Sequence, residues 1–268
     1  MRLRAGISCL LVLLGSLGLS ACSSQQEGSN TDPSQVDATT PPQAGACRVL
    51  SPGDVRQPAN ATRTVPCSDR HTAQTFAVGD MPGQFAHSSY GASSVSRWAY
   101  ETCSTKFEHY VGADDSLVLR TTISWAWFRP SRKAWDKGAR WYRCDVVGGN
   151  STSTSYVPLP QSAKGMLLGR PADRWLACAV GPTLAGATKI ACSQKHNWRA
   201  VTTIKLGESG DAYPGDRVAA SRSDAFCASS VKAWLNYPAT FQYGYTYFKK
   251  AEWEMGNRRS VCWAETSE

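Results

Sequence analysis

Two histidines follow cysteines at the same spacing, and they are the residues of this chain best placed to do chemistry. His71 comes four residues after Cys67, and His196 comes four residues after Cys192. Such histidines could contact a ligand or act as bases, and a Cys-x-x-x-His pair could bind a metal through a free thiolate. The alternative is that each imidazole satisfies backbone groups of the turn after the cysteine. We favour the turn, because a disulfide would remove the thiolate.

Other catalytic patterns are weak in this sequence. It contains no Gly-x-Ser-x-Gly motif for a nucleophilic serine and no Cys-x-x-Cys pair for redox chemistry. Glycoside cleavage requires a pair of carboxylates. The candidate acids are Glu101, Glu108, Asp114 and Asp115, and the second half of the chain has no corresponding set of acids. We therefore predict a protein without enzymatic activity, cofactor or metal. The alternatives are a cell-wall hydrolase with one of the two histidines as base, or a carbohydrate-binding protein.

The chain contains an internal duplication, which decides its architecture. Eight of the ten cysteines form two sets of four with similar spacing, which are Cys47, Cys67, Cys103 and Cys144, then Cys178, Cys192, Cys227 and Cys262. A Cys-Ser-x-x-His segment occurs in both sets. A closing segment also recurs at identical spacing, with Trp135, Gly138, Arg140 and Cys144 matching Trp253, Gly256, Arg258 and Cys262. Stacking of Arg140 or Arg258 on the neighbouring indole ring is consistent with this motif.

An even number of regularly spaced cysteines in an exported chain predicts disulfides. Four cysteines allow three pairings in each set. We favour first with second and third with fourth, because the gap between the first two varies while the sequences around them are retained. Each bridge would contribute roughly 3 kcal/mol on the loop-entropy model.

The hydrophobic patterns predict an α+β fold, in which each unit is a small antiparallel sheet with one packed helix. In the first unit we expect strands over 62–67, 72–78, 117–128 and 140–147, a helix over 94–111, and a helical turn over 131–137. In the second unit we expect strands over 189–192, 200–206, 240–248 and 260–263, and a helix over 218–235. Since the third cysteine lies on the helix and the fourth on the closing strand, their bridge would join helix to sheet.

The first 21 residues have the pattern of a bacterial lipoprotein signal peptide. Two arginines precede an apolar run that is too short to remain as a membrane span, and Leu19-Ser20-Ala21-Cys22 resembles a lipobox. Cleavage before Cys22 would leave this residue lipidated, and two acyl chains hold a protein firmly on a membrane. We therefore expect a lipid anchor on Cys22 at the extracytoplasmic face of the cell membrane.

Composition sets the remaining boundaries and the expected partners. Residues 22–44 are polar and predict a disordered tether, residues 45–148 and 172–268 are the two repeats, and residues 149–171 are a Gly/Ser/Thr/Pro-rich linker of which part packs.

Loss of Arg2 and Arg4 with the signal peptide lowers the number of Lys plus Arg from 29 to 27 against 21 Asp plus Glu, which gives the mature chain a net charge of about +6. This charge favours anionic neighbours, such as phospholipid headgroups or a cell-wall polymer, whereas the scattered basic residues do not indicate nucleic acid. A division-site protein is the other expected partner.

Trp125 and Trp127 lie two residues apart on a predicted strand and would share one face of it. Buried, they would form core under the helix. Exposed, they could stack on the sugar rings of a wall polymer. We favour the core.

As a set, these motifs resemble the septum formation family of actinobacterial envelope proteins. The family pattern is an early cysteine, a Val-x-Cys-x-x-x-His element, a helical cysteine, and a Trp-x-x-Gly-x-Arg segment that ends in cysteine. Here Val65 and Ile190 occupy its aliphatic position, and the resemblance covers nearly all of residues 45–265. It implies a role in septum formation without catalytic residues to transfer. One departure concerns the acidic residue that commonly follows the histidine by three positions, which is Gln74 or Arg199 here.

Overall fold

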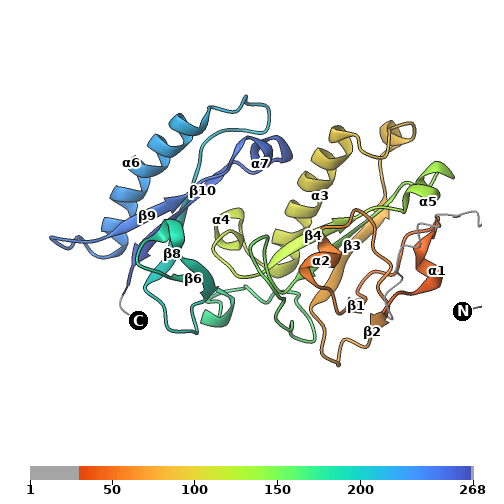
Figure 1. Ribbon diagram of the computed structural model, residues 1–268, viewed down its shortest axis with the longest axis horizontal. Helices are drawn as coiled ribbons and strands as arrows, with labels where there is room; N and C mark the ends of the chain where they lie inside the picture. Colours follow the sequence, from red (N-terminus) through yellow and green to blue (C-terminus); the bar gives the residue numbers. More distant parts are fainter. Residues whose placement is uncertain (1–29, 267–268) are drawn as a thin grey trace, which may run out of the picture. The chain divides into compact units, whose positions relative to one another are not determined.

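The computed structural model describes residues 30–266, so the predicted signal peptide, Cys22 and the start of the tether lie outside the described residues. Figure 1 shows two sheets, each with one long helix along a face. Both are five-stranded and antiparallel, with strand orders β2-β1-β3-β5-β4 and β7-β6-β8-β10-β9. The predicted class, two tandem α+β units, is confirmed.

The two repeats place equivalent elements in the same order along the chain. The strands of the first repeat are β1 (Cys47–Arg48), β2 (Thr64–Val65), β3 (Ala73–Asp80), β4 (Ser124–Phe128) and β5 (Trp141–Val147). Its helices are α2 (Pro52–Val55), α3 (Ser93–Val111), α4 (Asp115–Val118) and α5 (Arg132–Asp136), with a 3-10 turn, η1, at Gly83–Phe85.

The second repeat contains β6 (Ala177–Val180), β7 (Thr188–Ala191), β8 (Trp198–Lys205), β9 (Tyr243–Thr246) and β10 (Arg259–Glu265). Its helices are α6 (Asp216–Trp234) and α7 (Lys250–Met255), and the 3-10 turns η2 (Asp173–Trp175) and η3 (Leu184–Gly186) flank β6. The observed bounds of both long helices lie within two residues of those we predicted.

The long helices bury matching stripes of side chains at four-residue spacing, which is one face of an α-helix. In α3 these are Val95, Ala99, Cys103, Phe107 and Val111, and in α6 they are Ala219, Ser223, Cys227 and Val231. The third cysteine of each set therefore faces its sheet. Gly112 ends α3 in a left-handed conformation with φ of 77°, which glycine adopts without strain.

Four disulfides hold the repeats, and they are the pairs that we favoured from the spacing. They join Cys47 to Cys67, Cys103 to Cys144, Cys178 to Cys192, and Cys227 to Cys262. The first type of bridge joins the second strand of each sheet to a residue just after the neighbouring edge strand, and the second joins the long helix to β5 or β10, the fourth strand of its sheet. Helix and sheet are therefore covalently linked in both repeats.

Three predicted boundaries need correction. Residues 31–44 are ordered, since the tether contains α1 (Pro33–Val36) and Trp141 Nε1 donates to the Ala38 carbonyl at 3.0 Å. Part of the strand expected over 117–128 is instead helix α4, because the Asp114 carboxylate accepts a hydrogen bond from the Leu117 amide at 2.6 Å and caps a turn.

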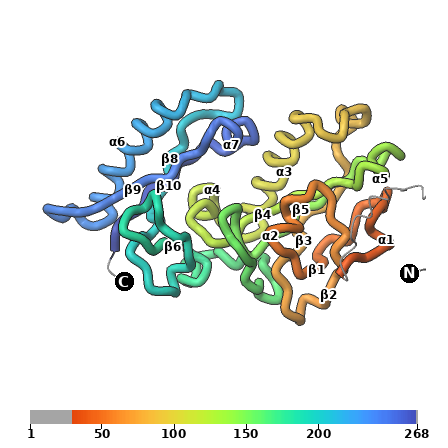
Figure 2. Tube along the Cα trace, in the orientation of Figure 1, coloured from red at the N-terminus to blue at the C-terminus, as the bar shows by residue number. Residues whose placement is uncertain are grey.

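The linker also packs, and more extensively than we expected. Leu159, Ala163 and Leu167 are buried in the core of the first repeat together with Phe107 and Val111 of α3. The path of these residues can be followed in the green part of the trace in Figure 2. Three residues of the segment 149–171 are therefore part of the first repeat's core, while the segment also connects the two repeats.

A cluster of charged residues is buried beneath the sheet of the first repeat, on the face opposite α3. Arg143 and Asp145 are 2% and 0% exposed and form an ion pair with a Nη2–Oδ2 distance of 3.0 Å. Thr75 Oγ1 donates to Asp145 at 2.7 Å and accepts from Arg48 Nη1 at 2.8 Å. Burial lowers the pKa of Arg143 to about 10, while the Asp145 carboxylate opposes this shift.

The second repeat has apolar residues at all four equivalent positions. Counting from the paired cysteines and the strand registers, Arg48, Thr75, Arg143 and Asp145 correspond to Ala179, Ala200, Val261 and Trp263. These four residues belong to one buried hydrophobic cluster. The duplicated fold therefore accepts either a charged or an apolar core at this place.

Candidate functional site

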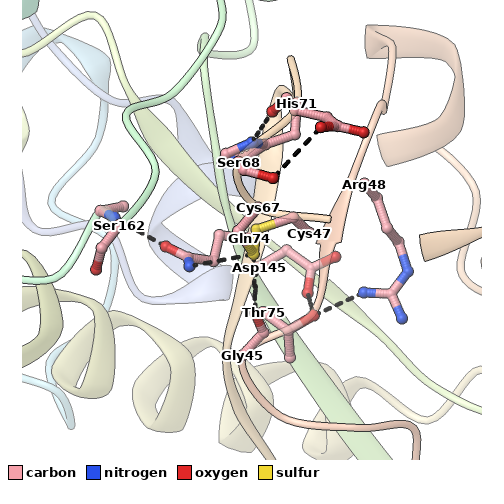
Figure 3. The surroundings of a disulfide bond; sticks show 12 residues. Gly45, Cys47, Arg48, Cys67, Ser68, His71, Gln74, Thr75, Asp145 and Ser162 are labelled. Carbon is pink, nitrogen blue, oxygen red and sulfur yellow. Dashed lines mark hydrogen bonds between the residues drawn. A yellow bond between two sulfur atoms is a disulfide. The ribbon is translucent and has the colours of Figure 1, made fainter. Parts of the chain in front are cut away.

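The two histidines occupy the same turn in each repeat. His71 Nδ1 lies 2.8 Å from the Asp69 carbonyl oxygen, and His196 Nδ1 lies 2.8 Å from the Gln194 carbonyl oxygen. Figure 3 shows the first of these turns beside the Cys47–Cys67 bridge. This is the backbone contact that we expected of a histidine that stabilises the turn.

Both imidazoles are buried, at 1% exposed for His71 and 5% for His196. The backbone of His71 is also covered, because its carbonyl accepts a hydrogen bond from the Leu159 amide of the linker at 2.9 Å. A base must reach the proton that it removes. A substrate could therefore reach His71 only after the linker and the turn had moved.

One set of residues in the described chain has the spacing of a metal site, namely Cys178, Cys192 and His196. Their potential ligand atoms lie within 4.8 Å of one another. Both sulfurs are joined in a disulfide, and a disulfide sulfur is not the thiolate that binds zinc. While this bridge is intact, the cluster lacks the ligands of a metal centre.

In this family an acidic residue commonly follows the histidine by three positions, and in this chain Gln74 and Arg199 occupy that position. Gln74 Oε1 accepts hydrogen bonds from Tyr110 Oη at 3.0 Å and from the Ala163 amide at 2.8 Å. Arg199 pairs with Asp173 at 2.8 Å. Gln74 therefore joins α3 to the linker, and neither side chain supplies a carboxylate to orient the imidazole.

The repeated Trp and Arg residues form matching stacks, as the motif suggested. The Arg140 guanidinium carbon lies 3.9 Å from the centre of the Trp135 ring, and the corresponding distance from Arg258 to Trp253 is 4.0 Å. In each pair the arginine also donates a hydrogen bond to the carbonyl of its own tryptophan. Both tryptophans are 3% exposed. These residues close the fold around the turn and present no indole surface to a ligand.

Trp125 and Trp127 share the helix-bearing face of β4, as predicted, but both are only half-buried. They line a groove with a volume of about 340 Å³, together with Tyr100 of α3, Arg129, and the segment 55–58. The Tyr100 ring meets Trp125 at a centroid distance of 5.2 Å and an angle of 66°. The interpretation as core is therefore only half correct, because part of each indole lines this groove.

Glu108 on α3 is the carboxylate with the strongest raised pKa among the described residues, at about 7. Partial burial is the main cause, and the negative charges of Asp115 and Asp114 add to it, while Arg259 opposes the shift. Since Asp115 forms an ion pair with Arg259 at 2.6 Å, the cation that could stabilise Glu108 is already engaged.

We expect Glu108→Gln to stabilise the protein at pH 8 and to have little effect at pH 5. The folded state raises the pKa of Glu108 from 4.5 to about 7, so it binds the proton more tightly than the unfolded chain, and stability falls as the pH rises between these values. Urea unfolding at both pH values measures the difference. Asp136→Asn, which removes an exposed carboxylate from α5, is the control, and an equal gain at pH 5 would contradict the prediction.

Fold and motifs together define a class of protein, a tandem duplication of a disulfide-bonded α+β domain whose repeated residues are mostly buried. The family described as Septum formation matches the chain twice, over residues 6–129 and 120–262, in agreement with two tandem copies. The chain belongs to this family. No curated protein and no solved structure matches it. Among the described residues, no helix is both long and apolar enough to cross a membrane.

Proposed function

We propose that this protein is a lipoprotein of the cell envelope, anchored through Cys22 at the extracytoplasmic face, that acts in septum formation as a non-enzymatic binding or structural module. Membership of the septum formation family supports the process. The lipobox before Cys22 and the disulfides support the compartment, because disulfides persist where the surroundings are oxidising.

The proposal that the protein is not an enzyme rests on the burial of the residues that the two repeats share. The shared cysteines, histidines and tryptophans are all buried except Cys67. Duplication has therefore kept the residues that hold the fold. A hydrolase with His71 or His196 as base would need these side chains at a surface where substrate binds.

A fluorescent fusion of the full chain, expressed in dividing cells of a host with lipoprotein processing, tests the septal role. We expect the signal to concentrate at the division site, because the family is associated with that process. Uniform distribution around the membrane would contradict the septal role.

The anchor is tested separately by Cys22→Ala. We expect this variant to leave the membrane fraction and to appear in soluble form, because the thioether that carries the lipid is lost. Cys9→Ala, which changes the cysteine within the predicted signal peptide, is the matched control and should remain in the membrane fraction. Retention of the Cys22 variant on membranes would overturn the lipid anchor.

A further inference from the structure

The groove beside β4 combines aromatic surface with positive charge. It is lined by Trp125 and Trp127 of β4, by Tyr100 of α3 and by Met255 of α7. The exposed segment 56–58 also lines the groove, and a hydrogen bond from the Arg129 amide to the Pro58 carbonyl at 3.0 Å joins this segment to the end of β4. A volume of about 340 Å³ lies at the lower end of small-ligand sites, which run from roughly 300 to 1,000 Å³.

The charged residues that line this groove all have the same sign. They are Arg56 and Arg129, and no aspartate or glutamate lines it. Arg56 is exposed. The arrangement is electrostatically complementary to an anion.

Arg129 follows the last residue of β4, and several contacts hold its side chain in position. Its guanidinium carbon lies 4.4 Å from the centre of the Tyr90 ring and 5.0 Å from that of Trp127, and one of its nitrogens donates to the Tyr90 carbonyl. Partial burial lowers the pKa of Arg129, as expected for a cation that has lost part of its hydration. An anion in the groove would replace some of that lost hydration.

The equivalent strand of the second repeat serves as an internal comparison. Counting from the paired cysteine on the neighbouring strand, Trp125, Trp127 and Arg129 correspond to Tyr243, Tyr245 and Tyr247. The residue equivalent to Tyr100 on the long helix is Asp224, and it accepts a hydrogen bond from Tyr243 at 3.0 Å. The second repeat thus places a carboxylate where the first has an aromatic ring, and it lacks the arginine.

We propose that the groove of the first repeat binds an anionic glycan of the cell wall, with a pyranose ring stacked on Trp127 and Trp125 and a carboxylate of the glycan paired with Arg129 and Arg56. A sugar ring has a flat apolar face and a polar rim, which suits indole surfaces bordered by a few hydrogen-bond donors. Arginine pairs with carboxylates through two parallel hydrogen bonds. This proposal rests on the proposed extracytoplasmic location, where wall polymers are found.

Binding of defined polysaccharides to the purified full chain in detergent tests this proposal. The probe is polygalacturonate, and its methyl ester is the matched control because it has the same rings without the charge. We expect calorimetry to show binding of polygalacturonate that weakens as salt is raised, and at least tenfold weaker binding of the ester. Equal affinity for both would overturn the role of the two arginines, and absence of binding to either would overturn the glycan site.

Variants locate the binding in the groove. Trp127→Ala and Arg56→Glu should each lower affinity for polygalacturonate about tenfold, and the exposed position of Arg56 leaves the fold undisturbed if the tryptophan variant unfolds. Tyr245→Ala, the equivalent substitution in the second repeat, should not change affinity. Unchanged affinity in the Arg56 variant, or an equal loss in the Tyr245 variant, would contradict the site. Because binding is measured on purified protein, failure here leaves the septal localisation result unaffected.

Discussion

Asp145→Ala is expected to destabilise the protein by about 3–5 kcal/mol, the range for removal of one partner of a buried ion pair. Asp145 is fully buried and forms an ion pair with Arg143, which is 2% exposed. Without the carboxylate, the buried Arg143 guanidinium loses its ion-pair partner, and the Thr75 hydroxyl loses its acceptor. Urea unfolding of the purified variant and the parent protein gives the difference in free energy.

Simultaneous replacement of all three charges tests the physical cause. Arg48→Met, Arg143→Met and Asp145→Leu together should cost less than Asp145→Ala alone, because an apolar substitute leaves no unpaired buried charge. The second repeat already has apolar residues at these positions. Lys250→Ala, which breaks an exposed pair with Glu254 on α7, is the surface control and should change stability by less than about 1 kcal/mol. A larger loss in the triple variant than in Asp145→Ala would contradict this explanation.

Removal of the Cys103–Cys144 bridge by double alanine substitution is the second large effect. The bridge closes a loop with a sequence separation of 41, and loop entropy of the unfolded chain assigns it about 4 kcal/mol. Both side chains are fully buried, so the packing between α3 and β5 weakens as well. We expect a lower urea midpoint, with the first repeat unfolding before the second.

The Cys178–Cys192 bridge is the matched comparison, because its sequence separation is only 14 and the same relation assigns it about 3 kcal/mol. Double alanine substitution there should cost less than loss of the Cys103–Cys144 bridge. The reverse order would show that local packing outweighs loop length. Mass spectrometry of the intact protein confirms that the other three bridges have formed.

The duplication made most of the fold predictable from the sequence. A pattern that is ambiguous when it occurs once becomes informative when it recurs at the same spacing. The recurrence allowed us to predict the long helices, the disulfide pairs and the order of the strands that follow each histidine. The first strand of each sheet was not predicted, because β1 contains only Cys47–Arg48 and β6 only Ala177–Val180. Such segments are too short to show a two-residue period.

Segments with little apolar content were the main source of error. The polar residues 31–44 are held by individual hydrogen bonds, such as Ser131 Oγ to Asp37 at 2.7 Å, and by the Lys133–Asp37 pair, also at 2.7 Å. Hydropathy patterns carry no information about such contacts, since the partners are about 95 residues apart. The buried charges of Arg48 and Asp145 were missed for the same reason, because their neighbours come from different strands.

The candidate binding groove was only partly accessible to sequence reasoning. The alternation along β4 correctly placed Trp125 and Trp127 on one face. Their partial exposure depends on how far α3 covers them, and the charge of the groove depends on segment 56–58, which reaches β4 from about 70 residues away. Neither property is encoded in local spacing. The two histidines could be identified because they recur at matching positions. The groove residues differ between the repeats, so a comparison of the repeats does not identify them.

The packed linker has a consequence for how the duplicated halves can be separated or exchanged. Leu159, Ala163 and Leu167 lie beyond the last strand of the first repeat in sequence and yet complete its core. The first repeat therefore folds with part of the segment that leads to the second repeat, and extends beyond its own last strand. A chain that ended at residue 148 would expose the apolar side chains of α3 that these three residues cover. A first repeat expressed alone should therefore extend at least to Leu167.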